Sequence, residues 1–171
     1  KLGSVDGQYL GIRLPTERYL PFDAPSILGV RLTNKCRSYV LPGIDDPDFL
    51  LYGGLAGRVW IEGVPKLHVD DDETRVTTPT INDTEAEVAI QFVVTNGWDR
   101  ERKLSVAWTM EHAQGNRVAA AEAIPMTLER QSNSGQVSVR LCVPTPRLWS
   151  PDHPELYRAR CRITADGAVI D

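Results

Sequence analysis

The stretch EAEVAIQFVV (residues 85–94) alternates polar and apolar residues with a period of two. Its apolar positions are Ala86, Val88, Ile90, Phe92 and Val94. This pattern is typical of a β-strand with one buried face. Asn96-Gly97, a dipeptide common in tight hairpin turns, follows directly. The stretch therefore predicts a half-buried strand that ends in a hairpin.

The same alternation recurs on both sides of this strand, and turn residues close each run. Pro125 interrupts one run and marks a sheet edge or a bend. The Ala-rich stretch from Val118 to Ile124 is too short for a stable helix and is interpreted as strand. Together these runs predict an all-β chain with an immunoglobulin-like β-sandwich of about seven strands. The other expected strands are 66–69, 74–81, 104–110, 118–128, 137–143 and 156–163.

Residues 1–61 have a different texture, because prolines break them into short pieces. Two strands are expected there, at 27–32 and 58–61. A segment of this length with so little continuous apolar pattern makes a marginal domain alone. We expect it to be part of a β-domain, and the sandwich to occupy residues 62–171.

Composition excludes several classes of function. The chain has 171 residues and a net charge of −4, and 42% of its residues are hydrophobic. It has no basic run longer than two residues, so a nucleic-acid partner is not expected. It has no apolar stretch of membrane-spanning length, and residues 1–11 lack a signal-peptide pattern. These features predict a soluble protein with no membrane partner. They leave the compartment unknown, with a bacterial cytoplasm and a periplasm as the two candidates.

The three cysteines, Cys36, Cys142 and Cys161, do not have the spacing of a zinc site. Strand alternation places Cys142 on the outward face of its strand and Cys161 on the buried face of another. A disulfide between them is therefore not expected. No glycine-rich phosphate loop is present either, so neither a metal nor another cofactor is expected.

Two segments are more specific than the strand pattern. DFLLYGGLAGRVWI (residues 48–61) resembles the segment that joins the sugar-binding domain to the immunoglobulin-like domain in glycoside hydrolase family 2. LWSPDHPELY (residues 148–157) is similar to the end of that immunoglobulin-like domain. Residues 5–8, 19–22 and 30–34 look like earlier parts of the family's jelly-roll domain. The resemblance implies that residues 1–61 are part of a jelly-roll sugar-binding domain.

The resemblance also implies one substrate-binding residue, Asp48. It matches an aspartate that reaches from the sugar-binding domain toward the hydroxyls of the substrate, and a carboxylate can accept two such hydrogen bonds. The alternative is an exposed loop acid beside Asp45 and Asp46. The chain departs from the family at Gly57, where arginine is usual, and in the short span 23–28.

Other residues in the two segments are expected to pack. Gly53-Gly54 permits a positive φ or a close backbone approach where a loop becomes a strand. Tyr52 and Trp60 are expected to wedge two β-domains together. Trp149 is expected to pack under a tight turn at Ser150-Pro151.

The carboxyl groups that the resembled family uses in catalysis are not expected in this chain. A retaining glycosidase needs two of them about 5 Å apart, and this family carries them on a barrel of about 250 residues. Such a barrel does not fit into 171 residues. We interpret Glu85, Glu87, Glu111 and Glu122 as solvated or charge-paired residues. His68, His112 and His153 lie in unrelated segments and do not suggest a catalytic triad.

The resemblance implies a non-catalytic accessory region of a retaining, β-galactosidase-like glycosidase. It would support the missing catalytic barrel and supply one wall of the sugar pocket, with a β-glycoside as the parent enzyme's partner. The alternative is a stand-alone sandwich for adhesion or carbohydrate binding. Such a module should expose a row of aromatic side chains, whereas Trp108 alternates with core residues and Trp98 stands in a turn.

Overall fold

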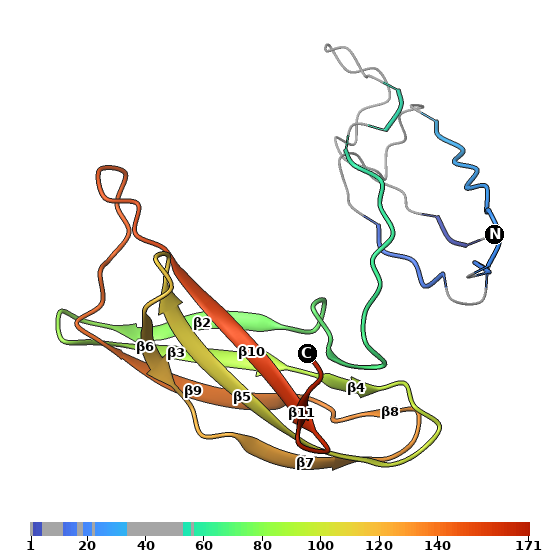
Figure 1. Ribbon diagram of the computed structural model, residues 1–171. Helices are drawn as coiled ribbons and strands as arrows, with labels where there is room; N and C mark the ends of the chain where they lie inside the picture. The colour runs from blue at the N-terminus through green and yellow to red at the C-terminus, as the bar shows by residue number, and fades with distance from the viewer. Residues whose placement is uncertain (1, 5–11, 17–18, 22, 34–52, 56) are drawn as a thin grey trace. The chain divides into compact units, whose positions relative to one another are not determined.

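A computed structural model describes residues 2–4, 12–16, 19–21, 23–33, 53–55 and 57–171 (Figure 1). The chain divides into two compact units, Lys1–Ile61 and Glu62–Asp171. All strands of the described residues belong to the second unit.

The second unit consists of antiparallel strands joined by turns and loops. No helix occurs among the described residues, and so none there could cross a membrane. The prediction of an all-β fold is confirmed. The strands are β1 Leu67–Val69, β2 Arg75–Ile81, β3 Glu85–Phe92, β4 Val94–Asn96, β5 Arg102–His112, β6 Arg117–Ala120, β7 Ile124–Leu128, β8 Ser132–Asn133, β9 Val137–Pro144, β10 Tyr157–Ala165 and β11 Ala168–Val169.

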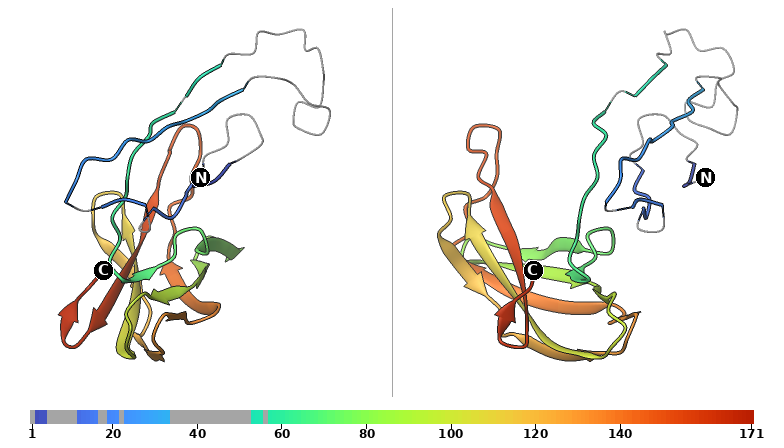
Figure 2. Two further views of the ribbon diagram at one scale, coloured as in Figure 1. Left: turned by 90° about the vertical axis from the view of Figure 1, so that its right-hand side faces the viewer. Right: turned by 45° about the vertical axis from the view of Figure 1, so that its right-hand side comes forward.

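The strands form the two layers of a sandwich, as Figures 1 and 2 show. One layer is the sheet β11-β10-β5-β6, with β7 also paired to β5. The facing layer contains β2-β3-β9 and the smaller sheet β1-β4-β8. The expected immunoglobulin-like sandwich is confirmed, and each of its seven expected strands corresponds to one or two observed ones.

Two of the expected strands are divided. The run that begins at Ala86 breaks at Val93, so that β3 pairs with β2 and β9 while β4 pairs with β1 and β8. The run 118–128 becomes β6 and β7, which pair with successive parts of β5. Pro125 lies in β7, which pairs only with β5 among the strands of the described residues, so the proline is at a sheet edge as expected.

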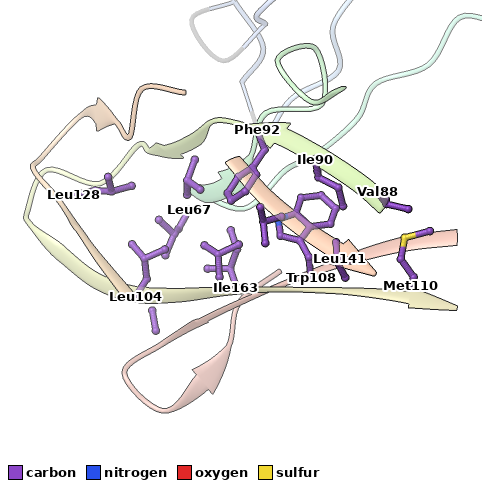
Figure 3. Packing of buried hydrophobic residues seen from close by; sticks show 14 of the residues in the cluster. Leu67, Val88, Ile90, Phe92, Leu104, Trp108, Met110, Leu128, Leu141 and Ile163 are labelled. Carbon is purple, nitrogen blue, oxygen red and sulfur yellow. The ribbon is translucent and has the colours of Figure 1, made fainter. Parts of the chain in front are cut away.

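The core lies between the layers, and the alternating positions of the sequence supply it (Figure 3). Val88, Ile90 and Phe92 of β3 face the side chains of β5. The rings of Phe92 and Trp108 meet at 5.4 Å between centroids, tilted by 57°. The buried cluster comprises Leu67, Ala86, Val88, Ile90, Phe92, Val94, Leu104, Val106, Trp108, Met110, Leu128, Val139, Leu141, Val143, Ile163 and Ala165.

The prediction of a hairpin at Asn96-Gly97 is wrong. The strands on either side of this dipeptide, β4 and β5, belong to different sheets and do not pair with each other. The Asn96 side chain is fully buried, and its amide donates to the carbonyl oxygens of Arg100 and Glu129 at 3.0 and 2.8 Å. A Cβ on Gly97 would lie 3.2 Å from the Lys66 carbonyl oxygen. The dipeptide therefore provides a buried polar anchor and a close backbone approach, at a crossover between the layers.

A hairpin of the Asn-Gly type occurs instead at Asp166-Gly167, between β10 and β11. Both residues have positive φ, 52° and 77°, as a type I′ turn requires. Asp166 also pairs with the buried Arg102 guanidinium at 2.9 Å. This turn thus connects the end of β10 to the start of β5.

The first unit lacks the two strands that the sequence predicts for it. The ranges 27–32 and 58–61 are not strands, so both of these strand predictions are wrong. The apolar side chains Ile27, Val30 and Leu32 are exposed. The described residues provide no neighbouring strand with which either range could form a ladder.

Because the sandwich closes its own core, we expect residues 62–171 to fold cooperatively when they are expressed alone. Residues 1–61 should not fold alone, since their described part contains no paired strand. Thermal unfolding followed by circular dichroism tests both fragments. A broad or absent transition for residues 62–171 would contradict the proposed boundary.

Candidate functional site

The residue expected to bind substrate, Asp48, lies outside the described residues, as do Asp45, Asp46 and Tyr52. Their roles stay predictions. Gly54 is described and has φ of +113°, a conformation that favours glycine. The expectation of a positive φ within Gly53-Gly54 is therefore confirmed. Trp60 is exposed, and its packing between two domains stays a prediction.

The second segment of the resemblance forms an ordered loop between β9 and β10. Ser150 and His153 exchange backbone hydrogen bonds of 2.9 and 3.1 Å. The Arg147 backbone N–H donates to the Tyr157 hydroxyl at 2.8 Å, and the Arg147 guanidinium lies 3.7 Å from the Glu155 carboxylate. Local polar contacts thus fix the loop without an apolar core of its own.

Apolar side chains of this loop point to solvent. Trp149 is 61% exposed, so the prediction that its indole packs under the loop is wrong. The polar contacts described above close the turn without the indole. Leu148 and Leu156 are exposed as well. An ordered loop that exposes a tryptophan and two leucines is typical of a surface that contacts another protein part.

The four glutamates expected to be solvated or charge-paired lie in β3, in β5 and after β6. Glu87 pairs with Arg140, and Glu111 with Arg160. The Cys142 thiol donates to the Glu85 carboxylate at 3.5 Å, and Glu122 is exposed. Each of these carboxylates is therefore solvated or held by a neighbour, as the sequence predicts.

The histidines have separate structural environments. His68 Nδ1 lies 2.8 Å from the Pro65 carbonyl oxygen, and the His112 ring stacks on Tyr157 at 4.8 Å between centroids. His153 belongs to the loop turn. Within the described ranges, no three His, Cys, Asp or Glu side chains come together as a metal site would require.

Cys142 and Cys161 are both free, as expected from their opposite faces. Burial, together with the nearby Asp171 carboxylate, raises the pKa of the Cys161 thiol to about 12. A thiol with such a pKa is a weak nucleophile at neutral pH. Cys161 is therefore a packing residue on the inner side of β10.

A stand-alone carbohydrate-binding module would expose tryptophan side chains, and the sandwich body has two tryptophans, Trp98 and Trp108. Trp108 is buried, as predicted. Trp98 is partly buried against the core, and Lys66 Nζ lies 4.9 Å from its ring centroid. Arg100 and Arg102 lie over the same ring at 5.5 and 5.6 Å. Three cationic side chains thus lie within cation–π distance of the Trp98 ring.

The comparisons with known proteins agree with this fold. The model of the family described as Glycosyl hydrolases family 2 matches residues 67–171. Among curated proteins, the chain is 28% identical over its whole length to a "Putative beta-glucuronidase" of Formosa agariphila, and 24% identical over 95% of its length to Beta-galactosidase BoGH2A of Bacteroides ovatus. It spans only 19% and 18% of the lengths of these relatives.

Two solved structures illustrate the likeness. A glycosyl hydrolase family 2 member from Bacteroides cellulosilyticus is 31% identical, with a TM-score of 0.58 over 63% of this chain and 15% of its own. Beta-glucuronidase 2 of Bacteroides uniformis is 23% identical, with a TM-score of 0.81 over 92% of this chain and 19% of its own. The second likeness concerns the fold alone.

Proposed function

The chain belongs to glycosyl hydrolases family 2, and from this membership we propose that it is the non-catalytic accessory region of a retaining β-glycosidase. Residues 1–61 would be part of a jelly-roll sugar-binding domain. Residues 62–171 would support the catalytic barrel, and Asp48 would contribute one wall of the sugar pocket. The proposed partners are the barrel and, through the complete enzyme, a β-glycoside.

One observation carries the proposal: the family match runs through the whole sandwich, yet the chain spans about a fifth of the length of the curated relatives it matches. Those relatives are named as a β-glucuronidase and a β-galactosidase. The substrate class proposed here is accordingly a β-glucuronide or a β-galactoside. Glu87 and Glu111 are each paired with an arginine, and Glu85 accepts from the Cys142 thiol, so these three carboxylates already have structural partners.

The loop between β9 and β10 supports the accessory role. Trp149, Leu148 and Leu156 are exposed on a segment that polar contacts hold in place. We infer that the barrel covers these side chains in the complete enzyme, since buried aromatic anchors are typical of stable interfaces. A fixed sandwich would then orient the sugar-binding part against the catalytic residues, and orientation of this kind strongly affects rates.

The stand-alone module is the weaker proposal. Neutral sugars bind to exposed aromatic faces, but in the sandwich Trp108 is buried and Trp98 is partly buried with three cationic side chains over its ring. Trp149 is exposed without another tryptophan beside it in the loop. The complete reading frame separates the two proposals. A barrel-length segment after Asp171 and glycosidase activity of the full product would support the first, and a chain that ends near Asp171 would contradict it.

We expect the 171-residue chain to leave p-nitrophenyl β-galactoside and β-glucuronide unhydrolysed, because the required carboxyl pair lies elsewhere in the proposed enzyme. Release of p-nitrophenol is followed against a blank without enzyme. Turnover above the blank that is lost in Glu87→Gln or Glu111→Gln would contradict the proposal. Loss in such a variant excludes a contaminating glycosidase as the source.

A further inference from the structure

Arginines gather on the outward face of the sheet formed by β10, β5 and β6. Arg158, Arg160 and Arg162 occupy alternate positions of β10, so they share one face at intervals of about 6.7 Å. Arg117 of β6 lies opposite Glu111 of β5 in the ladder. All four arginines are exposed. This is a concentration of positive charge on a chain whose net charge is −4.

A shallow hollow of about 120 Å³ lies on this face. Its floor is β5, where the outward residues Ala107 and Thr109 are small. Glu111 lies at one end, and the flanking strands contribute Arg117 on one side and Arg160 and Arg162 on the other. Because β6 and β10 both pair with β5, they are two strand spacings apart, about 9.5 Å. The hollow is therefore a slot bordered on both sides by guanidinium groups.

Among the described residues, no acidic side chain is in contact with three of these four arginines. Glu111 is the one acidic residue at the outward positions of β5, β6 and β10. The exposed Glu122 follows β6, where the Ala121 N–H still donates to the Trp108 carbonyl oxygen, so a second acidic residue flanks the arginines. It pairs with Arg160, and both contacts of that pair measure 3.2 Å. Within the part of the chain that the structure describes, Arg117, Arg158 and Arg162 have no ion pair or side-chain hydrogen bond. The surface thus has guanidinium groups free for an anionic ligand.

The Glu111–Arg160 pair indicates which anion fits. One carboxylate accepts from both Nε and Nη2 of the guanidinium, the two-pronged geometry that arginine and carboxylate share. The outward positions of the three strands carry no aromatic residue, so they offer no platform for stacking nucleobases. They also lack the large apolar anchors of a stable protein interface. A hydrophilic chain with regularly spaced carboxylates meets both conditions.

We propose that this arginine face binds a polysaccharide whose sugar units carry carboxylates, that is, uronic acids. The choice of a polysaccharide among polyanions rests on the proposed function, in which the complete enzyme acts on glycosides. The guanidinium groups bind the carboxylates, and the Thr109 hydroxyl on the floor is a partner for sugar hydroxyls. The sandwich thereby holds acidic segments of the substrate chain as well as supporting the barrel.

The test measures binding of the full 171-residue chain to polygalacturonate by calorimetry or biolayer interferometry at low salt. Fully methyl-esterified polygalacturonate is the matched neutral ligand, because it has the same backbone without the charges. We expect binding to the acid form only, weakened by raising the salt. Arg117→Gln/Arg162→Gln should lower the affinity about tenfold, since two charged contacts are lost.

The control variant Arg75→Gln/Arg130→Gln removes the same net charge from exposed arginines outside this face, and it should change the affinity less than about twofold. Melting temperatures show that each variant is folded. Equal losses in the two double variants, or binding of the methyl ester as tight as that of the acid, would overturn the proposal. Equal or tighter binding of poly-L-glutamate or single-stranded DNA, at matched charge, would assign the face to a different class of partner and overturn it too.

The binding test of the arginine face and the test of the accessory role can fail independently. Failure to bind polygalacturonate, with a glycosidase barrel present in the complete reading frame, would reject the arginine site alone. Binding by the arginine face in a protein whose complete reading frame lacks a barrel would reject the accessory role alone.

Discussion

Trp108→Ala should lower the free energy of unfolding of the chain by about 3–5 kcal/mol, the usual cost of truncating a fully packed large aromatic residue. Trp108 is 5% exposed at the centre of β5. Its ring contacts Phe92 of the opposite layer, so truncation leaves a cavity between the two sheets.

Urea unfolding of the 171-residue chain measures the effect, with Trp149→Ala as the matched control. The same side chain is removed there from an exposed loop, and the cost should stay within about 0.5 kcal/mol. Trp108→Phe should cost less than Trp108→Ala, because the phenyl ring fills part of the cavity that alanine leaves empty. Similar losses for Trp108→Ala and Trp149→Ala would contradict the assignment of Trp108 to the core.

The sandwich could be predicted from the sequence because most of its strands have one solvent-exposed face and one buried face. In β3 and β9 every second residue is buried or, at Val137, partly buried, and the sequence alternates in step with that burial. The break at Val93 could not be predicted, since the apolar run continues through it. It depends on pairing with distant partners: the Val93 carbonyl accepts from Asp70 N–H, and the Val94 N–H donates to the Ser134 hydroxyl.

The Asn96-Gly97 error has a similar cause. The dipeptide has the composition of a hairpin turn, but the Asn96 amide finds its partners at Leu128 and Glu129, more than thirty residues along the chain. Local turn chemistry does not include such contacts. Asp166-Gly167 obeys the local rule because its neighbouring strands pair directly across the turn.

The arginine face could not be predicted from runs of basic residues in the sequence. Arg158, Arg160 and Arg162 are separated by Ala159 and Cys161, so they form no run in the sequence. On a strand, alternate residues share a face, and the ladder with β5 adds Arg117 from β6. The hollow between these arginines depends on the pairing register of β6, β5 and β10, and this register cannot be derived from the sequence pattern alone.

Asp48, the candidate substrate-binding residue, is supported by the sequence alone. If Asp48 lines the sugar pocket of the complete enzyme, Asp48→Asn should lower kcat/KM roughly 10- to 150-fold. A charged hydrogen bond lost from a desolvated site is worth about 1.5–3 kcal/mol, which corresponds to that range. The amide keeps the shape of the side chain but removes the charge that accepts hydrogen bonds from sugar hydroxyls.

Asp45→Asn is the matched control, since it makes the same chemical change three residues away in the sequence. As a solvated loop acid, Asp45 should affect kcat/KM less than about twofold. The assay uses the complete enzyme with a chromogenic β-galactoside or β-glucuronide, and melting temperatures must agree closely so that a folding defect is excluded. Asp48→Asn should therefore separate from Asp45→Asn in kcat/KM and not in stability. Indistinguishable kinetics for the two variants would return Asp48 to the exposed loop acids and remove it from the proposed sugar pocket.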